Sequence, residues 1–162
     1  TLSSSSAASD VYKRQVEQAR GGLMGATKSI KPVWLAISVD DEDGSKLRSG
    51  EHVNEVIPLL AEFGAQALLV NCSSPEAVTK SIPLLSDCGI PIGAYANGFV
   101  NISDSFNKIG STVDLLKRRE DLTPSVYADF AQKWVTAGAT LVGGCCEVGP
   151  AHIKELSSRL RS

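Results

Sequence analysis

Residues 67–76, which read ALLVNCSSPE, decide the fold class, because an apolar run of strand length leads directly into the start of a helix. The run over residues 67–70 is entirely apolar, as is typical of a strand buried on both faces of a parallel sheet. Ser74 then places a capping side chain before Pro75, whose missing N–H costs nothing in the first turn of a helix. The stretch therefore predicts a β-strand followed by an α-helix.

The same order of strand and helix recurs along the chain. Similar apolar runs predict strands over residues 33–39, 90–94 and 140–142. Amphipathic stretches after polar turns predict helices over residues 52–63, 76–87, 125–137 and 151–161, and apolar spacing predicts one more helix over residues 16–30. This succession of about four βα units indicates an α/β fold with a parallel sheet covered by helices.

Glycines and loop lengths support this organisation. Gly64, Gly89 and Gly138 each follow a predicted helix, where glycine readily takes the left-handed conformation that ends helices. The connections over residues 40–51 and 98–122 are longer than usual, and long loops in compact domains are commonly functional. Both loops follow the carboxyl ends of strands, which is where parallel α/β folds bind their ligands.

Composition restricts the class of protein. A chain of 162 residues, 43% of them hydrophobic, normally forms one globular domain. Its net charge of −2 and the absence of basic blocks argue against nucleic acid or an anionic membrane as the partner. No segment has the roughly 18 apolar residues of a transmembrane helix, and no secretory signal is evident. A cytoplasmic protein that acts on small molecules is expected.

The first residues differ from the rest of the chain. Residues 1–15 are rich in serine and alanine and lack periodicity, so they are predicted to be a non-native or disordered head. Residues 16–162 are predicted to be the folded domain.

Three of the cysteines come at the ends of predicted strands. Cys72 follows the strand at residues 67–70, and Cys145 and Cys146 close the strand at residues 140–142. Residues at the carboxyl ends of curved parallel strands can converge on one point. Zinc prefers thiolate ligands in tetrahedral geometry, and three protein ligands leave the fourth position for a substrate atom. The pattern therefore predicts a three-thiolate zinc site.

Adjacent cysteines impose a condition on this site. Neighbouring side chains on a regular strand point to opposite faces, so Cys145 and Cys146 can share one ion only if the backbone bends. Gly143 and Gly144 permit such a bend and a close approach to the metal. The alternatives are three buried free cysteines, or a disulfide switch between Cys145 and Cys146. Cys88, at a helix end, is expected to pack in the interior.

Two segments that contain these cysteines resemble a known family. Residues 69–76, LVNCSSPE, and residues 143–153, GGCCEVGPAHI, resemble the two zinc-ligand motifs of the homocysteine S-methyltransferases. Residues 31–35, KPVWL, and residues 95–98, YANG, resemble two further segments of that family, and the resemblance extends from about residue 16 to the end. It implies that the chain forms the C-terminal half of a (β/α)8 TIM barrel and lacks the family's first four strands.

The resemblance also implies an activity. Cys72, Cys145 and Cys146 would bind zinc, and homocysteine would add its thiol as the fourth ligand. The thiolate would then attack a methyl group on a donor such as S-methylmethionine, giving methionine. The alternative is a non-catalytic zinc-binding or redox-responsive half-barrel, which would persist alone or pair with a second copy through its open strand edges to complete the barrel.

Other residues near the strand ends have less specific signals. Asn97 is expected either to line the substrate pocket or to form an Asn-Gly turn. Asn71, Gly143 and Gly144 are expected to support the metal ligands. His152 is interpreted as a solvated or packing side chain, and the acidic run over residues 40–43 as a solvated loop or a contact for a cationic donor.

Overall fold

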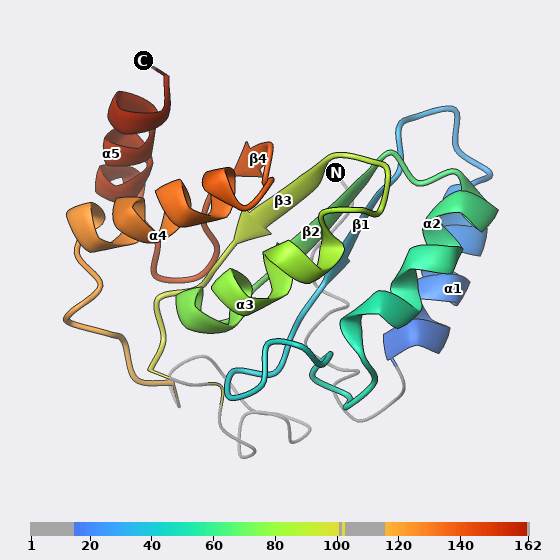
Figure 1. The fold of residues 1–162 in the computed structure, drawn as a ribbon, viewed down its shortest axis with the longest axis horizontal. Coiled ribbons are helices and arrows are strands. Elements are labelled where there is room, and N and C mark those ends of the chain that lie inside the picture. Colours follow the sequence, from blue (N-terminus) through green and yellow to red (C-terminus); the bar gives the residue numbers. More distant parts are fainter. Residues whose placement is uncertain (1–14, 101, 103–115, 162) are drawn as a thin grey trace.

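The computed structural model describes residues 15–100, 102 and 116–161 of the chain (Figure 1). The predicted head therefore lies outside the described residues except for Gln15, which begins a helix. Residues 101 and 103–115 of the long loop predicted over residues 98–122 also lie outside them.

In the described part of the chain, four parallel strands form a central sheet. They are β1 (Trp34–Ile37), β2 (Ala67–Asn71), β3 (Ile92–Tyr95) and β4 (Leu141–Val142). Their order in the sheet is β1-β2-β3-β4, which is the order of the sequence, and each neighbouring pair is parallel (Figure 1). The predicted α/β fold of about four βα units is confirmed.

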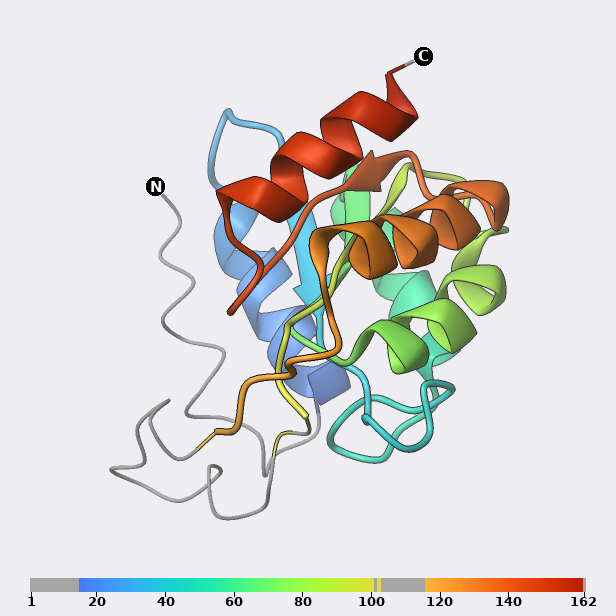
Figure 2. The ribbon, with the colours of Figure 1, turned by 90° about the vertical axis from the view of Figure 1, so that its left-hand side faces the viewer.

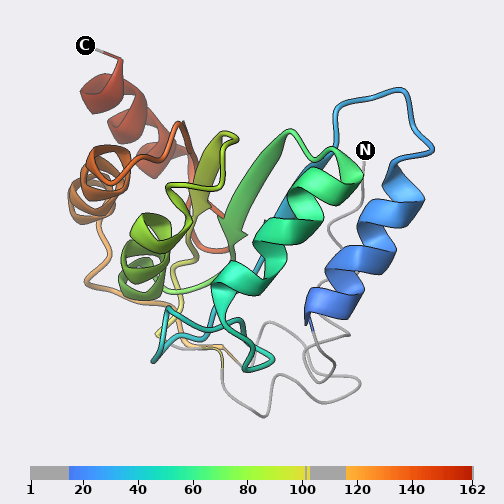
Figure 3. The ribbon, with the colours of Figure 1, turned by 45° about the vertical axis from the view of Figure 1, so that its right-hand side comes forward.

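Within the described residues, five α-helices flank the sheet. They are α1 (Gln15–Ala26), α2 (Ile57–Phe63), α3 (Pro75–Leu85), α4 (Pro124–Thr136) and α5 (Pro150–Leu160). Figure 3 shows α1 and α2 side by side near β1, and Figure 2 shows α4 and α5 together at the other end of the sheet. None of the described helices combines the length and apolar character that crossing a bilayer requires.

Two predicted helices differ from the observed ones. The helix predicted over residues 16–30 ends at Ala26, and Ile30 is fully exposed, so no buried contact stabilises another turn. The helix predicted over residues 52–63 divides into a 3₁₀ turn, η2 (Val53–Val56), and α2. Pro58 explains the division, because it has no N–H to donate to the carbonyl four residues before it.

Helix starts and ends agree with the sequence pattern. The side chains of Ser74 and Thr123 accept hydrogen bonds from backbone N–H groups at the starts of α3 and α4. Gly64, Gly89 and Gly138 have φ of 64°, 79° and 109°, which is the left-handed region predicted for them. These local signals set the position of each helix relative to the strand before it.

The main core lies between one face of the sheet and the helices. Leu35, Leu68 and Val70 are buried there, together with Trp134 and Tyr127 of α4. Side chains alternate along β1, so that Trp34 points to the opposite face and is 49% exposed. The helices thus cover one face of the sheet, and the loops at the carboxyl ends of the strands form the edge on which the cysteines lie.

Removing the α4 cap should weaken the fold by a small amount. Thr123→Ala deletes the hydroxyl that accepts from the Val126 N–H at 3.3 Å, and losses of this kind cost about 1 kcal/mol. Urea unfolding should show this loss in the free energy of unfolding. Thr136→Ala in the last turn of α4 is the control, with a change within about 0.5 kcal/mol. Equal losses in the two variants would contradict the capping role.

Candidate metal centre

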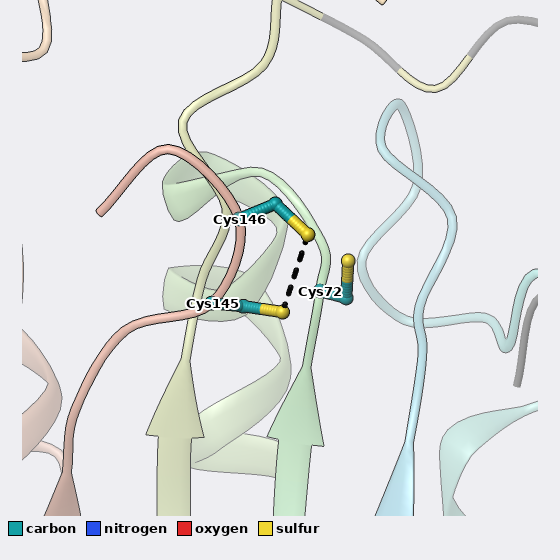
Figure 4. Close-up of side chains that lie close together, drawn as sticks. All are labelled: Cys72, Cys145 and Cys146. Carbon is teal, nitrogen blue, oxygen red and sulfur yellow. Dashed lines mark hydrogen bonds between the residues drawn. The ribbon is translucent and has the colours of Figure 1, made fainter. Parts of the chain in front are cut away.

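Three cysteine sulfurs converge at the carboxyl edge of the sheet. The Sγ atoms of Cys72, Cys145 and Cys146 all lie within 4.8 Å of one another, and those of Cys145 and Cys146 are 3.8 Å apart. Figure 4 shows Cys72 at the end of β2 and the other two cysteines on the loop after β4, with the sulfurs turned toward a common space. In the part of the chain that the structure describes, no other cluster of this kind is found.

These separations fit a tetrahedral metal. Zinc–sulfur bonds of about 2.3 Å in tetrahedral geometry place two sulfurs about 3.8 Å apart. The observed distance between the sulfurs of Cys145 and Cys146 has this value. The other sulfur–sulfur distances are at most 4.8 Å, so each would have to shorten by at most about 1 Å when a metal binds. The donor set is also the soft thiolate set that zinc prefers.

Cys72 owes its position to an unusual backbone conformation. It directly follows the last residue of β2 and has a φ of 52°, in the left-handed region that residues other than glycine rarely occupy. Its N–H donates to the Tyr95 carbonyl at 2.9 Å, which ties it to β3. The buried Ser73 hydroxyl then bonds both the N–H and the carbonyl of Val39 beyond β1. The chain thereby turns sharply from β2 into α3.

A turn after β4 presents the other two cysteines together. The Cys145 N–H donates to the Ala96 carbonyl at 2.9 Å, and the Gly98 N–H donates to the Cys146 carbonyl at 2.8 Å. The Val148 N–H donates to the Cys145 carbonyl at 3.1 Å, and Glu147 has a φ of 64°. Because the backbone leaves strand geometry here, adjacent side chains can lie on the same side.

Gly143 and Gly144 serve this loop by their small size. A Cβ on Gly143 would lie 2.8 Å from a ring carbon of Tyr95, and one on Gly144 would lie 2.1 Å from a methyl carbon of Val148. Neither glycine has a positive φ. They let the loop pack closely, and Glu147 adopts the left-handed conformation in the turn.

Tyr127 of α4 supports the same loop, although nothing in the sequence pattern marks it as part of the site. Its hydroxyl donates to the Gly143 carbonyl at 2.8 Å and lies 3.3 Å from the Ala96 carbonyl. Burial raises the pKa of Tyr127, so the hydroxyl stays protonated and remains a donor. It ties α4 to the ends of β3 and β4.

Tyr127→Phe should therefore destabilise the fold. The change leaves the Gly143 carbonyl without this donor, and an unsatisfied buried group costs about 1–3 kcal/mol. Urea denaturation measures the loss, and Tyr95→Phe is the control, because the Tyr95 hydroxyl has no hydrogen bond among the described residues. A loss no larger than that of the control would show that the Tyr127 hydroxyl does not support the loop.

The two asparagines differ in their surroundings. Asn97 is 1% exposed, its Oδ1 accepts from the Phe99 N–H at 3.0 Å, and its Nδ2 is 4.0 Å from the Cys72 sulfur. It therefore forms a turn and also reaches the sulfur cluster. Asn71 pairs with Tyr95 through the sheet, and its side chain makes no hydrogen bond within the described ranges.

Other residues of the sequence pattern have structural roles. His152 is 6% exposed, with Nδ1 accepting from the Gly149 N–H and Nε2 3.0 Å from the Leu122 carbonyl, so it packs as expected. Cys88 is half-buried, and its sulfur lies 3.4 Å from the Ile90 carbonyl. The acidic run is not simply solvated, because Asp41 accepts from the Ser74 N–H at 2.7 Å.

Electrostatic coupling within the cluster favours a bound cation. A hydrogen bond from the Cys72 thiol lowers the pKa of Cys145 to about 6. The pKa of Cys72 is raised, mainly by the same hydrogen bond and to a smaller extent by burial. The pKa of Cys146 is raised by burial and by the charge of Cys145. One cysteine of the cluster thus ionises readily. Ionisation of a second cysteine is unfavourable unless a bound positive charge compensates the repulsion between the thiolates.

The chain is similar to methyltransferases of homocysteine and selenocysteine. The homocysteine S-methyltransferase family profile matches residues 10–160, beginning within the predicted head. A selenocysteine methyltransferase of Astragalus bisulcatus is 27% identical over 151 residues, which are 90% of this chain and 41% of that protein. A homocysteine S-methyltransferase of Escherichia coli is 28% identical over 131 residues, 78% of this chain and 38% of that one.

Solved structures agree on the fold. The apo form of the homocysteine methyltransferase MmuM from Escherichia coli is 25% identical, with a TM-score of 0.65 over 89% of this chain and 46% of that chain. A metallated form of the same enzyme matches with a TM-score of 0.61. The prediction of a partial barrel is confirmed. The chain spans about two fifths of the length of the curated relatives it matches.

Proposed function

Because this chain belongs to the homocysteine S-methyltransferase family, we propose that Cys72, Cys145 and Cys146 bind one zinc ion that serves methyl transfer to the thiol of homocysteine. The product is methionine, and the methyl donor is a sulfonium or ammonium compound such as S-methylmethionine. The observation that carries this proposal is the convergence of three sulfurs from two distant segments within 4.8 Å of one another.

The donor set leaves one coordination position for the substrate. When bound, zinc supplies a Lewis acid that keeps a fourth, substrate-derived thiol deprotonated near neutral pH. The three cysteines are each only partly buried, which leaves room for an amino acid to approach the site. The Asn97 amide, already 4.0 Å from the Cys72 sulfur, lies close enough to contact a thiol bound beside it.

The remaining residues hold this arrangement rigid. Tyr127 fixes the carbonyl of Gly143, and the backbone bonds of Cys145 and Cys146 tie their loop to the segment after β3. Rigid support keeps three thiolates close together without an energetic penalty at each turnover. We place the protein in the cytoplasm, where reducing conditions preserve the free thiols.

A combined metal and activity experiment tests the proposal. The 162-residue chain is titrated with zinc and then assayed for methyl transfer from S-methylmethionine to homocysteine. Binding of about one zinc per chain is expected. Zinc binding without turnover by this chain would instead favour the non-catalytic half-barrel, and the absence of zinc binding would overturn the metal site.

A further inference from the structure

The loop between β1 and η2 lies against Cys72 on the side away from the other two cysteines. Figure 4 shows this loop in pale blue beside Cys72, at the end of β2. Arg48 of the loop directs its Nη2 to the Cys72 carbonyl at 3.0 Å. It contacts the one metal-ligand candidate that has a left-handed backbone conformation.

A carboxylate of the same loop holds the next turn of the chain. Asp41 Oδ1 accepts from the Ser74 N–H at 2.7 Å, and Oδ2 accepts from the Ile102 N–H at 3.1 Å. Asp41 Oδ2 is also 3.8 Å from Arg48 Nη2, and each of these two side chains is only 13% exposed. The pair therefore hydrogen-bonds to the backbone on both sides of Ser73, at the Cys72 carbonyl and at the Ser74 N–H.

The loop that carries the pair is itself anchored. The Arg48 N–H donates to the Ser38 carbonyl at 3.1 Å, which fixes the base of the loop against the end of β1. At its far end, the Ser81 hydroxyl of α3 donates to the Gly44 carbonyl at 2.5 Å. A Cβ on Gly44 would lie 2.3 Å from the Ala77 carbonyl oxygen, so the loop packs tightly on α3. The loop thus holds Arg48 in a defined position relative to β1 and α3.

We propose that Arg48, with Asp41, is a positioning pair that holds Cys72 in its left-handed conformation and so directs its sulfur toward Cys145 and Cys146. A backbone in this region persists only where its surroundings impose it, and the guanidinium supplies a charged hydrogen bond at the carbonyl of that residue. The inference rests on the proposed zinc site where it is tested by zinc binding. Where it is tested by hydrogen exchange in the metal-free chain, it rests on the backbone contacts alone.

The test compares Arg48→Met with a matched control, Arg20→Met. Arg20 lies on α1, is half-exposed and pairs with Glu62, away from the cysteines. Partners that orient a metal ligand typically contribute about 10–100-fold in affinity, so Arg48→Met should weaken zinc binding by that factor in a competition titration. The sulfur-to-cobalt charge-transfer absorption of the Co²⁺-substituted chain should fall as Cys72 leaves the metal. Arg20→Met should match the wild type in both.

A second readout needs no metal. In the metal-free chain, amide hydrogen exchange over residues 71–74 should be faster in Arg48→Met than in the wild type, with the α4 and α5 segments unchanged. Wild-type zinc affinity together with wild-type exchange in Arg48→Met would overturn the proposal. If the wild type binds no zinc, the proposed function fails, and the exchange comparison alone decides the role of Arg48. If Arg48→Met does not fold, Arg48→Lys is measured instead, with smaller changes expected in the same directions.

Discussion

Replacing Cys145 by serine should weaken zinc binding by more than about 100-fold, because removal of a residue that merely supports a ligand already costs about 10–100-fold. Cys72→Ser and Cys146→Ser should show losses of the same order, since each removes one of three sulfurs that lie within 4.8 Å of one another. The measurement is a competition titration of the purified chain against a chromophoric zinc chelator at constant pH.

Cys88→Ser provides the matched control for these variants. Cys88 is a half-buried free cysteine whose sulfur lies near the Ile90 carbonyl and not in the cluster. Its replacement should leave the zinc affinity unchanged. A variant of Cys72, Cys145 or Cys146 with wild-type affinity would remove that residue from the ligand set, and a loss in Cys88→Ser as large as theirs would show that the effect is not specific to the cluster.

Trp134→Ala should cause the largest loss of stability. Trp134 of α4 is fully buried in the core, and its ring contacts that of Tyr127 edge-on, with the ring centroids 5.5 Å apart. Its Nε1–H donates to Thr79 Oγ1 of α3 at 2.8 Å, so the side chain joins two neighbouring helices. Replacement of a buried tryptophan by alanine costs about 3–5 kcal/mol, a large part of the 5–15 kcal/mol typical of a whole domain.

Urea denaturation followed by circular dichroism measures this loss. Val135→Ala is the control, because the neighbouring valine is 43% exposed and its truncation should change the free energy of unfolding by no more than about 0.5 kcal/mol. If Trp134→Ala unfolds at the same urea concentration as the control, the packing of α4 on α3 does not support the fold as the structure indicates.

The sequence predicted those elements whose signals are local. Ser74 before Pro75 and Thr123 before Pro124 specify helix starts through their own side chains, so α3 and α4 begin within a residue of the predicted positions. The end of α1 depends instead on whether Ile30 has a tertiary contact, and the sequence pattern does not contain that information. The two-part form of the segment before β2 follows from Pro58, a local signal that the apolar periodicity concealed.

In the candidate site, too, only some of the residues could be predicted from the sequence. The cysteines could be placed near one another because all three follow strands whose carboxyl ends share one edge of the sheet. The residues that hold them could not be predicted, since Arg48 acts on a carbonyl and Tyr127 acts on another from a distant helix. Backbone contacts of this kind leave no pattern in residue type or spacing. Asp41 belongs to an acidic run typical of solvated loops, and only the folded chain brings it to the start of α3.

X-ray absorption at the zinc edge of the wild-type chain tests the central claim most directly. Without homocysteine, the spectrum should show three sulfur neighbours at about 2.3 Å and one lighter atom, as expected for a three-thiolate site with an open position. A first shell made of nitrogen and oxygen alone would contradict the assignment of Cys72, Cys145 and Cys146 as the metal ligands.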